Sequence, residues 1–71
     1  MKEYKRINVD NHIVDIMNIY DTYVVYFQYN NNYSQTKFFY NLELKKFLGF
    51  DDYKPTQRQL NYIENYILKM I

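Results

Sequence analysis

The sequence predicts an α+β fold: a small antiparallel β-meander of three or four strands, then a short helix, then a C-terminal amphipathic helix packed on one sheet face. Three observations predict it. Residues 4–40 consist of short runs rich in β-branched and aromatic residues, separated by Asn and Asp. From residue 57 onward, apolar residues recur with a helical period. The length of 71 residues allows one domain, spanning residues 1–71.

The composition indicates how so short a chain builds a core. A domain of this size buries only about 60% of the surface that its unfolded chain exposes. The chain has no cysteine and one histidine, which excludes disulfides and zinc–thiolate sites and predicts no metal or cofactor. It has ten tyrosines and five phenylalanines, and large aromatic side chains can anchor a small core.

The first two strands are expected at Tyr4–Val9 and Ile13–Tyr20. Asp10–Asn11 between them is a plausible two-residue turn, because Asp and Asn tolerate positive φ angles. The β-branched residues of the second segment favour a strand. A helix is the alternative there, because Asp10 could cap it and one helix face would hold Ile13, Ile16, Met17 and Tyr20.

A central hairpin is expected from Tyr23–Asn30 and Tyr33–Tyr40, after a turn at Asp21–Thr22. A tight turn at Asn31–Asn32 would set its register and its two faces. The inner face would then hold Tyr23, Val25, Phe27, Thr36, Phe38 and Tyr40. The outer face would hold Val24, Tyr26, Gln28, Tyr33, Gln35, Lys37 and Phe39. A three-residue loop would instead place Phe39 inside and Phe38 outside.

Two helices are expected after the hairpin. Asn41 can cap a short helix over Leu42–Leu48, and Gly49 stands where a helix end favours a left-handed residue. Thr56-Gln57-Arg58-Gln59 matches a capping box, with Gln59 at the third helical position. The helix that begins there should reach Met70. Its apolar stripe holds Leu60, Ile63, Ile67 and Met70.

No residue pattern indicates catalysis, so the chain is not expected to be an enzyme. The only serine is Ser34 and the only histidine is His12, on different predicted strands, and His12 reads as a solvated turn residue. The adjacent carboxylates Asp51–Asp52 lack a calcium-binding loop around them and read as a solvated link.

Charge balance limits the class of partner, and hydropathy predicts a cytoplasmic protein. The formal net charge is +1, too balanced for a strongly electrostatic nucleic-acid binder. No apolar run is long enough for a membrane span, and the first residues lack the apolar stretch of a signal peptide. The abundant Asn, Tyr, Ile and Lys have AT-rich codons, which suggests a low-GC bacterium or its phages and mobile elements.

The outer face of the central hairpin is the candidate functional surface. Its partner-binding candidates are Tyr26, Tyr33, Lys37 and Phe39. The function expected is protein binding, either to a second copy of the chain or to another protein. A phage or mobile-element protein of this kind would bind or inhibit a host or defence protein. The alternative is single-stranded nucleic-acid binding, with bases stacked on exposed rings and phosphates near Lys37, Lys45 and Lys46.

Overall fold

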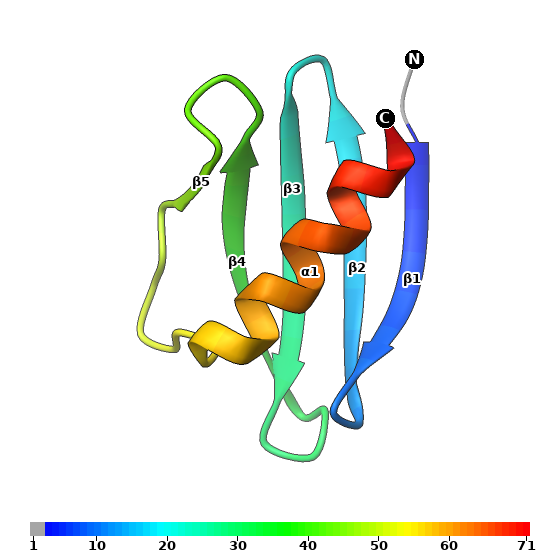
Figure 1. Cartoon of the computed structure of the whole chain (residues 1–71). Coiled ribbons are helices and arrows are strands. Elements are labelled where there is room, and N and C mark those ends of the chain that lie inside the picture. Colours follow the sequence, from blue (N-terminus) through cyan, green and yellow to red (C-terminus); the bar gives the residue numbers. More distant parts are fainter. Residues whose placement is uncertain (1–2) are drawn as a thin grey trace.

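The chain folds into a five-stranded antiparallel sheet with one helix packed on one of its faces (Figure 1), in a computed structural model that describes residues 3–71. The strands follow one another across the sheet in chain order, so the α+β class and the meander are confirmed. Three or four strands were expected, whereas residues 3–71 form five. The elements are β1 (Glu3–Val9), β2 (His12–Ile19), β3 (Thr22–Tyr29), β4 (Ser34–Asn41), β5 (Lys46–Leu48) and α1 (Gln57–Met70).

The segment for which strand and helix were both considered is a strand. Asp10 and Asn11 have φ angles of 52° and 68°, and Val9 pairs with His12 across this two-residue turn. β2 then pairs with β1 on one side and with β3 on the other. The helical alternative was therefore wrong, because ladder pairing on both edges uses the backbone groups that a helix would need.

The turn between β2 and β3 lies one residue earlier than expected. It consists of Tyr20–Asp21 rather than Asp21–Thr22, since Ile19 pairs directly with Thr22. Tyr20 has a φ angle of 59° and is 89% exposed. A positive φ at the first turn residue is characteristic of the type II′ hairpin turn, where glycine is the usual residue. Because this position holds tyrosine rather than glycine, the sequence did not indicate this turn.

Replacing Tyr20 with Gly should raise the free energy of unfolding by about 0.5–1 kcal/mol, because glycine adopts a positive φ without the steric cost that a tyrosine bears. Tyr33→Gly is the matched control. Tyr33 is equally exposed, at 88%, but is not among the residues with positive φ. Urea denaturation should show a gain for the first variant only. Equal effects would mean that the Tyr20 backbone is not strained.

The register of the β3–β4 hairpin is the one expected from a tight turn at Asn31–Asn32. The Tyr33 amide donates to the Asn30 carbonyl oxygen at 3.1 Å, and all three asparagines have positive φ angles of 54–66°. Val24 therefore pairs with Phe39, and Tyr26 pairs with Lys37. Phe38 points into the core and Phe39 to the other side, which rules out the three-residue loop.

The short helix expected at Leu42–Leu48 is wrong: this segment is one turn followed by β5. Asn41 does cap that turn, because its side-chain oxygen accepts from the Leu44 amide at 2.9 Å. Lys45 then adopts a φ of 53°, which ends the turn. Phe47 pairs with Tyr40 and packs on its ring at 4.8 Å between centroids. Seven residues make a weak helix, and this contact with the sheet outweighs it.

α1 begins and ends where the sequence predicts. Thr56 accepts from the Gln59 amide at 3.2 Å, and the Gln59 side chain accepts from the Thr56 amide at 2.9 Å, so the capping box is confirmed. The helix crosses the sheet diagonally (Figure 1). Its buried apolar residues join those of the sheet in one core. The core members with no exposed surface are Val14, Ile16, Val25, Phe27, Phe38, Tyr40, Ile63 and Ile67.

Contacts between aromatic rings hold residues 49–56, the link between β5 and α1, against the sheet. Tyr53 stacks on Tyr29 with 4.0 Å between ring centroids, and Phe50 packs on Phe38 at 5.0 Å. The buried Thr36 hydroxyl donates to the Tyr53 carbonyl oxygen at 3.3 Å. Gly49 has the expected positive φ, 77°, but it follows a strand rather than a helix.

One buried polar group joins the helix to the sheet. The Tyr40 ring has no exposed surface, and its hydroxyl donates to Oε2 of Glu64 at 2.6 Å. Burial, together with the hydrogen bond and the negative charge of Glu64, raises the pKa of Tyr40 to about 12. The neutral phenol is therefore the form that the folded protein prefers.

Alkaline pH should destabilise the fold through Tyr40. A phenol in the unfolded chain titrates near pH 10, so stabilisation by the neutral phenol is complete below that pH and is lost as pH rises through about 12. The expected loss is on the order of 2 kcal/mol. Tyr40→Phe should make the decline of unfolding free energy between pH 10 and 12 shallower. An unchanged slope in urea denaturation would contradict this role.

Among residues 3–71 there is no helix with the length and apolarity that crossing a lipid bilayer requires.

Candidate functional site

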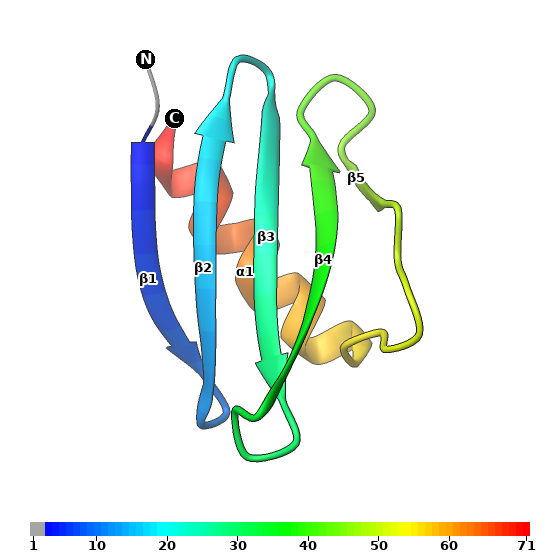
Figure 2. The ribbon, with the colours of Figure 1, turned by 180° about the vertical axis from the view of Figure 1, so that it is seen from behind.

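The face of the sheet opposite α1, here called the open face, is not covered by any element of residues 3–71 (Figure 2). Side chains alternate between the two faces along each strand. The residues of β2, β3 and β4 that pack with α1 are one set of alternate positions, as in Phe38 and Tyr40. The intervening positions, such as Val24, Tyr26 and Phe39, therefore form the open face.

An apolar row crosses the open face from one edge of the sheet to the other. The backbone pairings place one residue from each strand side by side. From β1 to β5 the apolar row consists of Tyr4, Met17, Val24, Phe39 and Leu48. Its ends are the more exposed: Tyr4 is 53% and Leu48 37% exposed, whereas Val24 at the centre is 8% exposed. This is a contiguous apolar strip on a face that no helix or further strand of residues 3–71 covers.

Phe39 is held in place by two neighbours. The Nζ atom of Lys37 lies 5.9 Å from the centroid of the Phe39 ring, within the range of a cation–π contact. The backbone of Gly49 lies against the same ring, since a Cβ atom there would come within 2.9 Å of Cδ2. Glycine thus lets the chain pass close to the ring, and both contacts reduce the ring area that remains open to a ligand.

A polar row runs beside the apolar row and contains Arg6, Asp15, Tyr26 and Lys37. Arg6 donates two hydrogen bonds to the Asp15 carboxylate, at 2.8 and 3.2 Å, and the Tyr4 hydroxyl donates a third at 2.8 Å. The bonds from Arg6, more than any other cause, lower the pKa of Asp15. Asp15 therefore stays ionised at neutral pH, with its charge already balanced.

Three of the four candidate residues come together and one does not. Tyr26, Lys37 and Phe39 lie on the open face, with Tyr26 and Phe39 partly buried. Tyr33 was expected at the start of the returning strand, but it closes the turn after Asn30 and precedes β4. β3 ends at Tyr29 and β4 begins at Ser34, so four residues connect the strands instead of the two expected, and Tyr33 lies at the tip of the hairpin.

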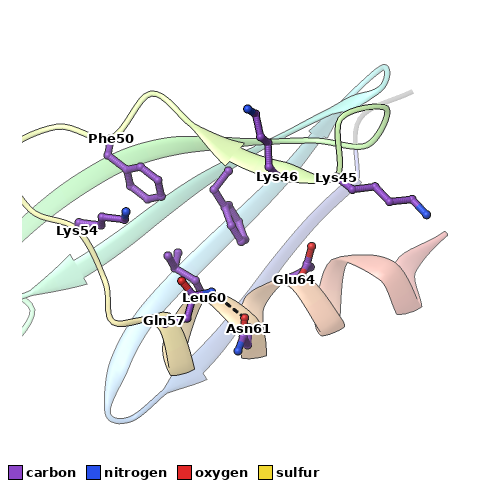
Figure 3. A pocket seen from close by; sticks show the side chains of 9 residues that line it. Lys45, Lys46, Phe50, Lys54, Gln57, Leu60, Asn61 and Glu64 are labelled. Carbon is purple, nitrogen blue, oxygen red and sulfur yellow. Dashed lines mark hydrogen bonds between the residues drawn. The ribbon is translucent and has the colours of Figure 1, made fainter.

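The other two lysine candidates are separated. Lys45 lies in the turn before β5, and Lys46 lies in β5 beside Asn41 on the open face. Both border a hollow of about 250 Å³ between the link and α1, whose apolar lining is Phe47, Phe50 and Leu60. Their side chains point away from it and from each other (Figure 3). Lys45 and Lys46 therefore do not form one anion-binding cluster.

His12 is not the solvated turn residue that was expected. It is partly buried, and its ring stacks on Phe27 with 4.9 Å between centroids. Its Nδ1 atom lies 2.8 Å from the Gln28 carbonyl oxygen, and because a carbonyl only accepts, this nitrogen donates. Within the described part of the chain, no three His, Asp or Glu side chains gather as metal ligands.

Part of the apolar row was not predicted from the sequence. Tyr4, Met17 and Leu48 lie on strands whose pairings were not predicted. The Asp10–Asn11 turn was a sufficient signal for the pairing of Tyr4 with Met17, because a two-residue turn there sets the register of β1 and β2. No local signal could have found Leu48, because its segment resembles a helix.

Comparison of the chain with protein-family models, with curated proteins and with solved structures finds no match.

Proposed function

We propose that this chain is a non-enzymatic protein-interaction module of the cytoplasm that binds a partner protein through the open face of its sheet. The observation that carries the proposal is the apolar row, which crosses all five strands while no element of residues 3–71 covers it. Contiguous apolar patches of this kind mark binding surfaces more often than scattered surface residues do.

The composition of the face favours a protein over single-stranded nucleic acid. Base stacking needs free ring faces, and the Phe39 ring already contacts Lys37 and Gly49. The middle of the apolar row is aliphatic, with Met17 and Val24, which offer no ring for a base. Buried aliphatic and aromatic residues surrounded by polar ones are the usual centre of a protein interface.

Photocrosslinking in the native cell tests the proposal. A photoreactive benzophenone residue would replace Tyr26 on the open face, with Tyr62 on the exposed side of α1 as the matched control position. A covalent adduct with another protein at position 26, absent at position 62, supports the proposal. Equal adducts at both positions, or none at position 26, would contradict it.

Two other adducts would reassign the function. Crosslinking to nucleic acid at position 26 would support the nucleic-acid alternative, and oligonucleotide binding that weakens steeply with salt would confirm it. Crosslinking to a second copy would make the open face a self-association surface. Once a partner protein is known, Tyr26→Ala should weaken its binding by about 1–3 kcal/mol, and Lys37→Ala should weaken it less.

A further inference from the structure

The charges of the protein are unevenly distributed between the open face and the rest. Among residues 3–71, the charged residues of the open face are Arg6, Asp15, Lys37 and Lys46, which amount to a formal charge of +2. The other charged side chains of residues 3–71 comprise five basic and seven acidic groups, a formal charge of −2. Because Arg6 is paired with Asp15, the excess positive charge of the face belongs to the two lysines.

These two lysines lie on opposite sides of the apolar row. Lys37 precedes Phe39 by two residues on β4, and Lys46 precedes Leu48 by two residues on β5. Because the strands are antiparallel and Phe39 pairs with Leu48, one lysine is on each side of that pair. Two residues of strand span about 7 Å, so the lysines are separated by roughly 13 Å along the strands. Neither has an ion-pair partner among residues 3–71.

We infer that the open face binds an amphipathic α-helix of the partner protein whose apolar stripe is flanked on both sides by carboxylates. The inference rests on the proposed function. An α-helix is about 10–12 Å wide, which fits between flanking charges at this separation. The apolar row crosses four inter-strand intervals, or about 19 Å, the length of roughly 13 helical residues. The opposite face already holds a helix of similar length, the 14-residue α1.

Other occupants fit the face less well. A partner strand lying across it would find no free backbone groups, because the strands beneath use theirs in the sheet ladders. A second copy of the chain would place two faces of the same positive net charge against each other, and like charges disfavour association. A helix flanked by carboxylates instead meets an apolar centre and two cations that have no ion-pair partner among residues 3–71.

A pair of designed peptides tests the inference. Both would be helical, of about 14 residues, with the same leucine stripe; one would have Glu and the other Lys on both sides of the stripe. Fluorescence anisotropy with the whole chain should show at least about tenfold tighter binding of the Glu peptide at low salt, with the difference shrinking as salt rises.

Charge reversal supplies the control. Lys37→Glu with Lys46→Glu should make the protein prefer the Lys peptide. Lys54→Glu with Lys69→Glu makes the same change in net charge away from the open face and should leave the preference for Glu intact. The inference is overturned if both double variants behave alike, if both peptides bind equally, or if neither binds. A protein adduct at position 26 together with any of these results would keep the proposed function and remove only the acidic helix.

Discussion

Replacing Phe38 with Ala should lower the free energy of unfolding by about 3–5 kcal/mol, because it leaves a cavity in the core. The Phe38 ring has no exposed surface and packs against Phe47 and Phe50, with 5.5 and 5.0 Å between ring centroids. Since a domain of this size has only about 5 kcal/mol of stability, the variant should be largely unfolded at 37 °C. Far-UV circular dichroism during urea denaturation would measure the loss.

Phe39→Ala is the matched control for Phe38→Ala. It removes the same side chain from the next residue, but on the open face, where Phe39 is only partly buried. Less apolar surface returns to water, so the cost should be less than about half that of Phe38→Ala. The opposite order of the two costs would place Phe39 in the core and shift β4 by one residue.

Replacing Ile67 with Ala should cost about 2–5 kcal/mol, the second largest effect expected. Ile67 has no exposed surface and lies where α1 meets the sheet, whereas its neighbour Leu68 is 43% exposed. Leu68→Ala removes a side chain of the same size from the adjacent helical position and should cost much less. If the two variants melt at similar temperatures, the helix face that packs on the sheet is assigned wrongly.

Local patterns explain which parts of the fold could be predicted. α1 runs over the predicted residues because a capping box and a stripe of apolar side chains are both encoded within the segment itself. The β3–β4 register was predictable because Asn31–Asn32 is a short stretch that tolerates positive φ angles. In each case the determining interactions join residues that are close in the sequence.

β5 was missed because contact with the sheet, rather than a pattern within its own segment, determines it. Asn41 caps a turn as a helix would begin, and only the pairing of Phe47 with Tyr40 on the sheet shows that the segment becomes a strand. The turn at Tyr20 was missed for a different reason. Tyrosine seldom adopts a positive φ, so nothing in the residue type marked it.

The same distinction explains what could be predicted of the candidate site. Tyr26, Lys37 and Phe39 were placed on one face because the hairpin register alone assigns them there. The expected turn at Asp21–Thr22 would have paired Met17 with Tyr26, whereas the observed turn pairs it with Val24. A shift of two residues preserves the face but breaks the row, so the continuous apolar row emerges only from the complete sheet.

Oxidation of the methionines inside the native cell tests most directly whether a partner covers the open face. Met17 lies in the apolar row and Met70 on α1, and both are partly buried in the isolated chain. Hydroxyl radicals should oxidise both methionines in the purified protein, and mass spectrometry would measure the extent of oxidation. In the cell, we expect Met17 to be protected relative to Met70. A Met17-to-Met70 oxidation ratio that is the same in the cell as in the purified protein would contradict a docking role for the open face.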